Sequence, residues 1–438
     1  MILRLSSSKS RVIVLAFAFV CAVLVSYFSI RSAVAAHYVG LESREGYENA
    51  TRLEPKNFEN WQRLGRYWQY NLEDLNTARA IQAYTVALSL NPRSADTWAA
   101  MGAAYEAEGN IPAARDAFLR AKNAYPVSPE FSWRYGNFLL RQGETDAAFL
   151  EIRRAVEVEP QRGAEALSRA LRAEPNLDLV LDRVLPPLKD AYISAIVGQT
   201  DEAHIANAGQ VWNRLAALHP KLKLDSYSFA LVGALLQEKQ VAEAHRIWEQ
   251  AVDFAGLGNL PEPTGSVLWD GGFESGVSGS GFAWAFPEGD QGVQFNIDHR
   301  ERRSGNQSLR LLFNGRYNLH LLGPCIEVLV QPSTDYDFSA WVRTSSITTA
   351  QGIRFQLRPL GTQDASTATT NDVRGTQPWT RVETPWSSGK EAQEMQVCVE
   401  RLPSEYEVDD KIRGMAWVDD VALVPAAPAP ATAEPRKP

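Results

Sequence analysis

A period of 34 residues in the first half of the chain limits how this sequence can fold more than any other feature. One unit carries its small, aromatic and proline positions at Trp98, Gly102, Tyr105, Ala114, Phe118, Ala121 and Pro126. The pattern returns 34 residues later at Gly136, Leu139, Ala148, Ile152, Ala155 and Pro160, and 34 residues earlier at Tyr84, Ala87 and Pro92. A fixed period of this length predicts stacked repeats, in which each unit buries its apolar face only against its neighbours.

The chemistry of the repeated positions predicts a pair of helices in each unit. The glycines let two helices approach closely, the alanines suit the point where helices cross, and each proline ends a second helix because proline cannot continue one. The first helix of the earliest unit is displaced by three residues, which predicts a longer helix or turn before Ala80. That helix carries Trp61, Leu64, Gly65 and Trp68.

In the order Trp-x2-Leu-Gly-x2-Tyr, Ala-x3-Phe-x2-Ala and Pro, these positions resemble the tetratricopeptide repeat. The resemblance implies an α-helical solenoid over residues 37–255, whose concave side docks a protein partner. Weaker second helices follow around Trp212 and Trp248, which extends the array to about five units. Consensus positions in solenoids are packing positions, so we expect the docking residues among the exposed, non-consensus side chains.

Residues 12–30 form an apolar run without a charged side chain. A membrane-spanning helix needs about 17–25 such residues. Arg4, Lys9 and Arg11 precede the run, and this basic excess predicts that residues 1–11 lie in the cytoplasm and the bulk of the chain in the periplasm or outside. We therefore expect a single-pass anchor in a bacterial-type cytoplasmic membrane.

A second interpretation of this segment stays open. The motif Ala33-Val34-Ala35 fits a signal-peptidase site, and cleavage near Ala35 would release a secreted chain. The apolar run is longer than the roughly 7–15 residues of a usual signal peptide, which favours the retained anchor.

The pattern changes beyond residues 256–265, a Gly- and Pro-rich stretch that predicts a linker. Seven short alternating runs follow at 294–297, 308–313, 325–330, 337–342, 353–357, 396–400 and 415–423. Short strands separated by turns predict an antiparallel β-sandwich, or jelly roll, over residues 266–425. The ring of Trp341, inside one of these strands, is expected to face the core. Residues 426–438 are rich in Pro and Ala and predict a disordered tail.

The predicted fold class is therefore a multidomain α + β chain: a transmembrane helix, an α-helical repeat solenoid and a C-terminal antiparallel β-sandwich. Motifs of the sandwich resemble the jelly-roll carbohydrate-binding modules of the galactose-binding-like group. These motifs are Trp269-Asp270-Gly271-Gly272-Phe273-Glu274, Ser304 to Leu309, Tyr336 to Arg343, and Trp417 to Leu423.

The resemblance implies a structural calcium ion held by Glu274 and Asp420, which would tie the first strand of the sandwich to the last. The alternative is that these carboxylates only accept hydrogen bonds from turn amides. No other cofactor is expected.

A sugar site would need exposed aromatic faces with polar groups at their edges. The candidates are Trp284, Phe286, Tyr317, His320, Trp379 and Trp386. For each of them core packing is the alternative, because large aromatic side chains are mostly buried.

Three cysteines are present: Cys21 in the apolar run, and Cys325 and Cys398 in the sandwich. None belongs to a Cys-x-x-Cys pair, which argues against a zinc site. In an oxidising compartment, Cys325 and Cys398 are candidates for a disulfide, and two buried thiols are the alternative.

The net charge of −8 offers no basic face for nucleic acid. The sequence contains no P-loop, GxGxxG, HExxH or GxSxG motif, so we do not expect an enzyme. The leading hypothesis is an exported, membrane-anchored scaffold that docks a protein on its repeats and a polysaccharide on its sandwich, in the assembly or export of a cell-surface polysaccharide. One alternative is a structural envelope assembly factor without glycan binding. Another is a glycan hydrolase, which would need paired carboxylates in a cleft.

Overall fold

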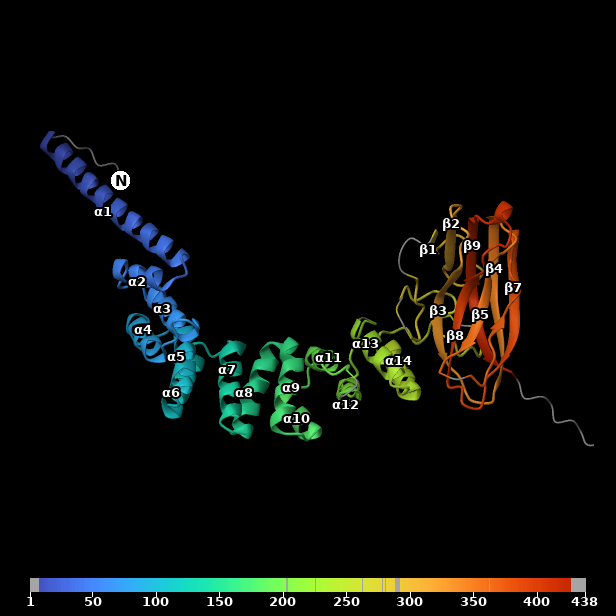
Figure 1. Ribbon diagram of the computed structural model, residues 1–438, viewed down its shortest axis with the longest axis horizontal. Helices are drawn as coiled ribbons and strands as arrows, with labels where there is room; N and C mark the ends of the chain where they lie inside the picture. The colour runs from blue at the N-terminus through green and yellow to red at the C-terminus, as the bar shows by residue number, and fades with distance from the viewer. Residues whose placement is uncertain are drawn as a thin grey trace, which may run out of the picture. The chain divides into compact units, whose positions relative to one another are not determined.

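Figure 1 shows the computed structural model of the chain. The structure describes residues 8–201, 204–224, 226–261, 263–277, 279, 281–287, 292–361 and 363–426. The chain divides into two compact units, one up to Ala191 and one from Tyr192. Most of the predicted cytoplasmic N-terminus and all but residue 426 of the predicted Pro/Ala tail lie outside the described residues.

The first unit is helical throughout its described part (Figure 1). Its elements are α1 (Ser8–Gly40), α2 (Arg44–Leu53), α3 (Phe58–Tyr70), α4 (Thr77–Leu90), α5 (Ala95–Ala107), α6 (Ile111–Ala124), α7 (Pro129–Arg141), α8 (Thr145–Val158), a 3-10 turn (Pro160–Arg162), α9 (Gly163–Ala173) and α10 (Leu177–Val184). Side chains cap several N-termini: Asn76, for example, accepts a hydrogen bond from the Arg79 backbone N–H at 3.0 Å.

The helices pair as the 34-residue period predicts. Helices α3 and α4, α5 and α6, and α7 and α8 pack together, and each second helix ends two residues before the proline of its repeat. Each repeated glycine lies against a large side chain of its partner helix: Gly65 against Tyr84, Gly102 against Phe118, and Gly136 against Ile152. The predicted repeat architecture is confirmed.

Helix α1 is long and apolar enough to cross a membrane, judged by length and composition. It does not end with the apolar run but continues to Gly40, and its last turns pack on α2. Ala35 is 1% exposed, and the Arg31 side chain donates a hydrogen bond to the backbone carbonyl of Leu53. The candidate membrane segment and the turns that pack on α2 therefore belong to one continuous helix.

Helix α11 (Lys189–Val197) crosses the division between the units, and α12 (Ile205–Ala216), α13 (Ser226–Gln237) and α14 (Val241–Phe254) belong to the second unit. The weak repeat positions Trp212 and Trp248 are buried. Trp248 also meets Trp269 edge-on, with ring centroids 5.2 Å apart. The last helix therefore packs directly on the β domain.

The β domain has two antiparallel sheets (Figure 1). Its strands are β1 (Val293–Asp298), β2 (Ser308–Asn314), β3 (Leu321–Leu329), β4 (Asp335–Ile347), β5 (Arg354–Pro359), β6 (Ala368–Thr369), β7 (Gly375–Ser387), β8 (Glu394–Arg401) and β9 (Arg413–Pro425), with a 3-10 turn at Glu407–Asp409. The five-stranded sheet has the order β1-β2-β9-β4-β7, and the four-stranded sheet the order β3-β8-β5-β6. Alternate side chains of both sheets meet in one core that includes Phe338 and Phe355. The predicted sandwich is confirmed.

The expectation for Trp341 is wrong. Strand side chains alternate between faces, and Phe338, Ala340 and Val342 point into the core. Trp341 lies an odd number of residues from each of them, so it faces outward, half-buried, with the Arg303 guanidinium 4.5 Å from its ring centroid.

Candidate binding sites

The first candidate site is a groove in the first unit, formed by the first helices of successive repeats. It has a volume of 610 Å³ and receives side chains from α3, α5, α7 and α9. Small residues such as Ala99 and Ala103 keep it open, and Trp133 gives it an aromatic floor. Most of the other lining residues are polar, which suits an extended peptide whose backbone needs hydrogen-bond partners.

Arginines outnumber acids on the walls of this groove. The charged lining residues are Arg66, Arg134, Arg141, Arg169, Asp96 and Glu130. Arg141 forms an ion pair with Glu106 at 2.7 Å, and the hydrogen bond to that carboxylate raises the pKa of Arg141. Arg134 and Arg169 also form ion pairs, with Glu130 and Glu165. Arg66 is exposed and takes part in no ion pair among the described residues, so it is the arginine of the groove best placed to meet an acidic group of a ligand.

Trp133 is held in place from both sides. The guanidinium groups of Arg162 and Arg169 lie 5.1 and 5.3 Å from its ring centroid. Arg169 also donates to the side-chain oxygen of Asn137 at 2.7 Å. These contacts fix the groove floor before any ligand arrives, which lowers the entropy cost of binding.

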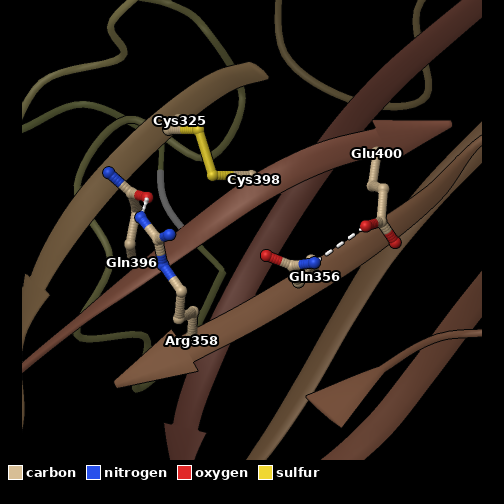
Figure 2. Close-up of a disulfide and its surroundings, with 6 residues drawn as sticks. All are labelled: Cys325, Gln356, Arg358, Gln396, Cys398 and Glu400. Atoms are coloured by element: carbon tan, nitrogen blue, oxygen red, sulfur yellow. Dashed lines mark hydrogen bonds between the residues drawn. A yellow bond between two sulfur atoms is a disulfide. The ribbon is translucent and has the colours of Figure 1, made fainter. Parts of the chain in front are cut away.

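The second candidate site is the outer face of the four-stranded sheet, shown in Figure 2. Gln356 of β5 donates to Glu400 of β8 at 2.8 Å, and Arg358 donates to Gln396 at 2.6 Å. Glu400 is buried, whereas Gln356 and Gln396 are half-buried and Arg358 is exposed. The amides and the guanidinium group therefore offer donors and acceptors to a ligand lying on this part of the sheet.

The disulfide candidates lie on the same face (Figure 2). Cys325 of β3 and Cys398 of β8 are directly opposite each other in the strand register, and the structure joins them in a disulfide. The bond connects β3 to β8 across 73 residues of sequence. It fixes the register of the two strands beneath the polar face.

The predicted sugar-stacking aromatics are not brought together. The prediction of a sugar-stacking role is wrong for Trp284 and Trp386. They are 1% and 3% exposed and lie in the sandwich core. Their indole N–H groups donate to the backbone carbonyls of Asp270 and Ser366, so neither ring has a face free for a sugar.

The other four candidates keep some exposure but are scattered. Phe286 is half-buried and packs on Phe295, with ring centroids 5.6 Å apart. Tyr317 and His320 are exposed between β2 and β3, and Trp379 is half-buried on β7 of the other sheet. Their role in sugar binding stays a prediction.

The carboxylates predicted to hold calcium gather around the loop between β1 and β2. Glu274 accepts a hydrogen bond from the Asn306 backbone N–H at 2.6 Å, and Asp420 accepts one from the Ser304 hydroxyl at 2.5 Å. The neighbouring Asp419 accepts one from the Arg303 backbone N–H at 2.7 Å. Burial raises the pKa of Asp419 to about 6.

This arrangement does not fit a calcium site well. In the described part of the chain, no group of three or more His, Cys, Asp or Glu side chains is placed to hold a metal ion. Backbone N–H and hydroxyl donors already occupy the carboxylate oxygens that calcium would need. The geometry agrees with the alternative interpretation, in which the acids bond turn amides, and calcium stays a prediction.

Sequence reasoning missed a pair of carboxylates on β3 and β8. Glu327 and Glu394 share a hydrogen bond, and burial together with the charge of Glu327 raises the pKa of Glu394 to about 8. Strand alternation could have placed both residues on the outer face, but it does not give the register that pairs them. A retaining glycosidase holds its two carboxyl groups about 5–5.5 Å apart, so a directly bonded pair does not match that geometry.

No protein-family model matches the sequence, and no curated protein matches it. Among solved structures, the MamA protein is similar at 18% identity, covering 40% of this chain and 93% of its own, with a TM-score of 0.32. YrrB, a tetratricopeptide repeat protein with an unusual peptide-binding site, is 14% identical over 49% of this chain and 94% of its own, with a TM-score of 0.26. A family 16 carbohydrate-binding module is 16% identical over 36% of this chain and 99% of its own, with a TM-score of 0.25.

These likenesses concern the fold. The class of protein follows from the geometry already described, namely helix pairs at a 34-residue period and a sandwich of two antiparallel sheets. The chain is a repeat protein of paired helices whose sequence pattern resembles the tetratricopeptide repeat, and it has a C-terminal antiparallel β-sandwich.

Proposed function

We propose that this chain is a membrane-anchored scaffold that docks a protein partner in the groove of its first unit, outside the cytoplasm. The observation that carries the proposal is the arginine-rich groove with the fixed Trp133 floor. An acidic, extended segment of the partner occupies it, with its carboxylates on the arginines and its backbone on the polar walls.

Export and anchoring rest on the N-terminal helix. The basic residues before the apolar run favour a cytoplasmic N-terminus, and helix α1 continues beyond the apolar run to Gly40, where its last turns pack on α2. A disulfide between Cys325 and Cys398 is also in keeping with an oxidising compartment.

The docking proposal can be tested with peptides and the full chain in detergent. We expect an acidic peptide to bind more tightly than its amide-substituted counterpart, and Arg66→Glu to weaken binding at least tenfold. Arg93→Glu is the matched control, because Arg93 is exposed and lies outside the groove. Equal binding by wild type and Arg66→Glu would exclude this groove as the docking site.

The second proposed function is glycan binding by the sandwich, at the polar sheet face in Figure 2. Amide and guanidinium groups side by side on neighbouring strands match the hydroxyls of a sugar chain. With a protein on the repeats and a glycan on the sandwich, the scaffold would act in the assembly or export of a cell-surface polysaccharide. Without glycan binding, the remaining proposal is a structural assembly factor.

A panel of bacterial polysaccharides, tested with the full chain in detergent, separates these two cases. We expect saturable binding that is lost in a Gln356→Ala, Gln396→Ala double variant. It should be retained in Gln377→Ala, since Gln377 is an exposed residue of β7 in the other sheet. If no polysaccharide binds, or if both variants lose binding equally, the glycan role is rejected while the docking proposal stands.

A further inference from the structure

A cleft of 740 Å³ lies within the second unit, between α14 and the β domain. Its walls are largely apolar and aromatic, with Trp248 from α14, Trp269 and Phe282 from the segment before β1, and Tyr336 from β4. Val267 also lines it and is 39% exposed. Apolar surface left open in this way points to a binding site, because water-facing apolar surface is unfavourable until something covers it.

Two hydrogen-bond donors beside the cleft lack acceptors. The indole N–H groups of Trp248 and Trp269 are buried, and neither has a partner in the described part of the chain. Buried N–H groups are nearly always paired in folded proteins. The two rings meet edge-on with centroids 5.2 Å apart, so a ligand carbonyl reaches these nitrogens only when the rings separate.

The cleft also has a charge preference. Three acids line it, Glu249, Asp253 and Glu327, and the lining residues include no Lys or Arg. Burial lowers the pKa of His245, the one histidine in the lining, so it adds no positive charge near neutral pH. Glu249 and Asp253 are exposed at the α14 side, where they can meet cationic groups. The cleft therefore suits a segment that is apolar and basic at one end.

The chain itself supplies such a segment at the edge of the cleft. Pro425, the last residue of β9, lines the cleft and pairs with Tyr336. The sequence that follows contains four further prolines and the basic pair Arg436-Lys437. Proline-rich segments favour the polyproline II conformation, which has no internal hydrogen bonds and leaves its carbonyls free. At about 3.1 Å per residue, eleven residues would reach about 34 Å, enough to bring the basic pair to the rim on α14.

We propose that residues 426–438 of this chain bind in the cleft between α14 and the sandwich. The prolines pack against Val267 and the half-buried Trp269, and the Arg436-Lys437 pair lies beside the acidic rim. Aromatic-lined grooves bind proline-rich segments in this way in general. The cleft borders the polar sheet face, because Glu327 pairs with Gln396 in the strand register, but the two sites share no lining residue. The inference therefore does not rest on the proposed function.

The test compares the full chain with a chain that ends at Ala426, both in detergent. The probe is a fluorescein-labelled peptide with the sequence of residues 426–438, followed by fluorescence anisotropy. We expect saturable binding to the shortened chain, at least tenfold tighter than to the full chain, whose own tail competes. Charge reversal in the peptide, with Arg436→Glu and Lys437→Glu, should weaken binding at least tenfold.

Protein variants locate the site. In the shortened chain, Glu249→Lys with Asp253→Lys should weaken peptide binding at least tenfold, whereas Glu383→Lys, an exposed change on β7, should not. Val267→Asp puts a charge on the cleft wall at an exposed position and should also reduce binding. Circular dichroism and the unfolding midpoint check that each variant is folded.

Several results would overturn the proposal. Peptide binding that is equal for both chains, absent from both, or unaffected by the rim charges would show that the tail does not use this cleft. Dimers of the full chain that dissociate when the tail is removed would show that the occupant comes from a second copy instead.

Discussion

The repeated glycines set the distance between helices in the first unit. A Cβ atom built on Gly65 would lie 2.5 Å from Cε1 of Tyr84, and one on Gly136 would lie 2.9 Å from Cγ1 of Ile152. Contacts this short are not tolerated, so the ring of Tyr84 or the helix carrying it would have to move. The large side chain of the partner helix, Tyr84 or Ile152, thus packs where the glycine has no side chain.

The substitution Gly65→Ala should therefore destabilise the repeat array by about 1–3 kcal/mol, the usual cost of overpacking a core. Differential scanning calorimetry of the full chain in detergent would detect it as a lower unfolding temperature. The control is Gly233→Ala in α13, where no atom lies within 4 Å of the built Cβ. There we expect no loss, and up to about 1 kcal/mol of gain from helix propensity. Equal losses for both variants would contradict the close-approach argument.

Glu394 makes the stability of the second unit depend on pH up to about pH 8. Its pKa is raised to about 8 in the folded chain, so the folded state holds the proton more tightly than the unfolded state does. Stability should then fall as the pH rises toward 8 and level off beyond it. His245 acts with the opposite sign, because burial lowers its pKa, but its contribution is complete once the pH exceeds about 6.5.

We therefore expect the urea midpoint of the β domain, followed by tryptophan fluorescence, to decrease from pH 6.5 to pH 8. Glu394→Gln should remove most of this slope, because an amide does not titrate. A midpoint that rises over this range, or a slope unchanged in Glu394→Gln, would show that the shared proton does not control stability there.

Predictions for single residues succeeded where the 34-residue period determined which helix contact a residue makes. They failed where the surroundings of a residue depend on strand register or on contacts that are distant in sequence. The spacing of Gly102 and Gly136 was sufficient to place both at helix contacts. Trp284 and Trp386 could not be assigned to the core from the sequence, because their burial depends on contacts with residues far away in the chain. The Glu327–Glu394 pair depends on a strand register that no local pattern encodes.

At the scale of single elements, strand β7 is the one long strand that the sequence pattern did not predict. It contains Pro378 and Pro385, which usually argue against a strand because proline cannot donate to the ladder. Strand β7 lies at the edge of the five-stranded sheet, and both prolines are exposed there. An edge strand tolerates proline, and it also discourages pairing with other chains. The other strands predicted from alternation are present, with bounds that shift by a few residues.

The disulfide joins two elements that are close in the sheet and far apart in sequence. Reduction, or Cys398→Ser, should lower the stability of the sandwich by about 2–4 kcal/mol, because the unfolded chain regains the freedom of a long loop. Chemical denaturation with and without reductant measures this difference. Cys21→Ser is the control, since Cys21 lies in α1 and is not bonded to another cysteine. If reductant leaves the denaturation midpoint unchanged, the bond contributes nothing to stability.

At the scale of the whole molecule, the end of α1 bears on the choice between anchor and signal peptide. A protease needs an accessible backbone, yet Ala35 is buried in a helix that packs on α2. We expect the chain isolated from membranes to retain its N-terminal helix, which intact-mass spectrometry would show. A chain that begins at Ala36 would instead support secretion after cleavage.

The order of the parts along the chain was predictable, but the division into units was not. The compact units separate after Ala191, and the last helices associate with the sandwich through contacts such as Trp248 with Trp269. The sequence offered only a composition change at residues 256–265. Tertiary contacts between aromatic side chains leave no periodic signal, so the pattern could not place the boundary.

The packing of the last turns of α1 on α2 also has a kinetic consequence. If α1 is retained in the bilayer, the groove moves with the lipid in two dimensions, and a partner that is itself attached to the membrane meets it at a high local concentration. A groove of modest intrinsic affinity would then be occupied most of the time by membrane-bound partners and rarely by freely diffusing ones. Selectivity between partners would come from lateral diffusion as much as from the side chains that line the groove.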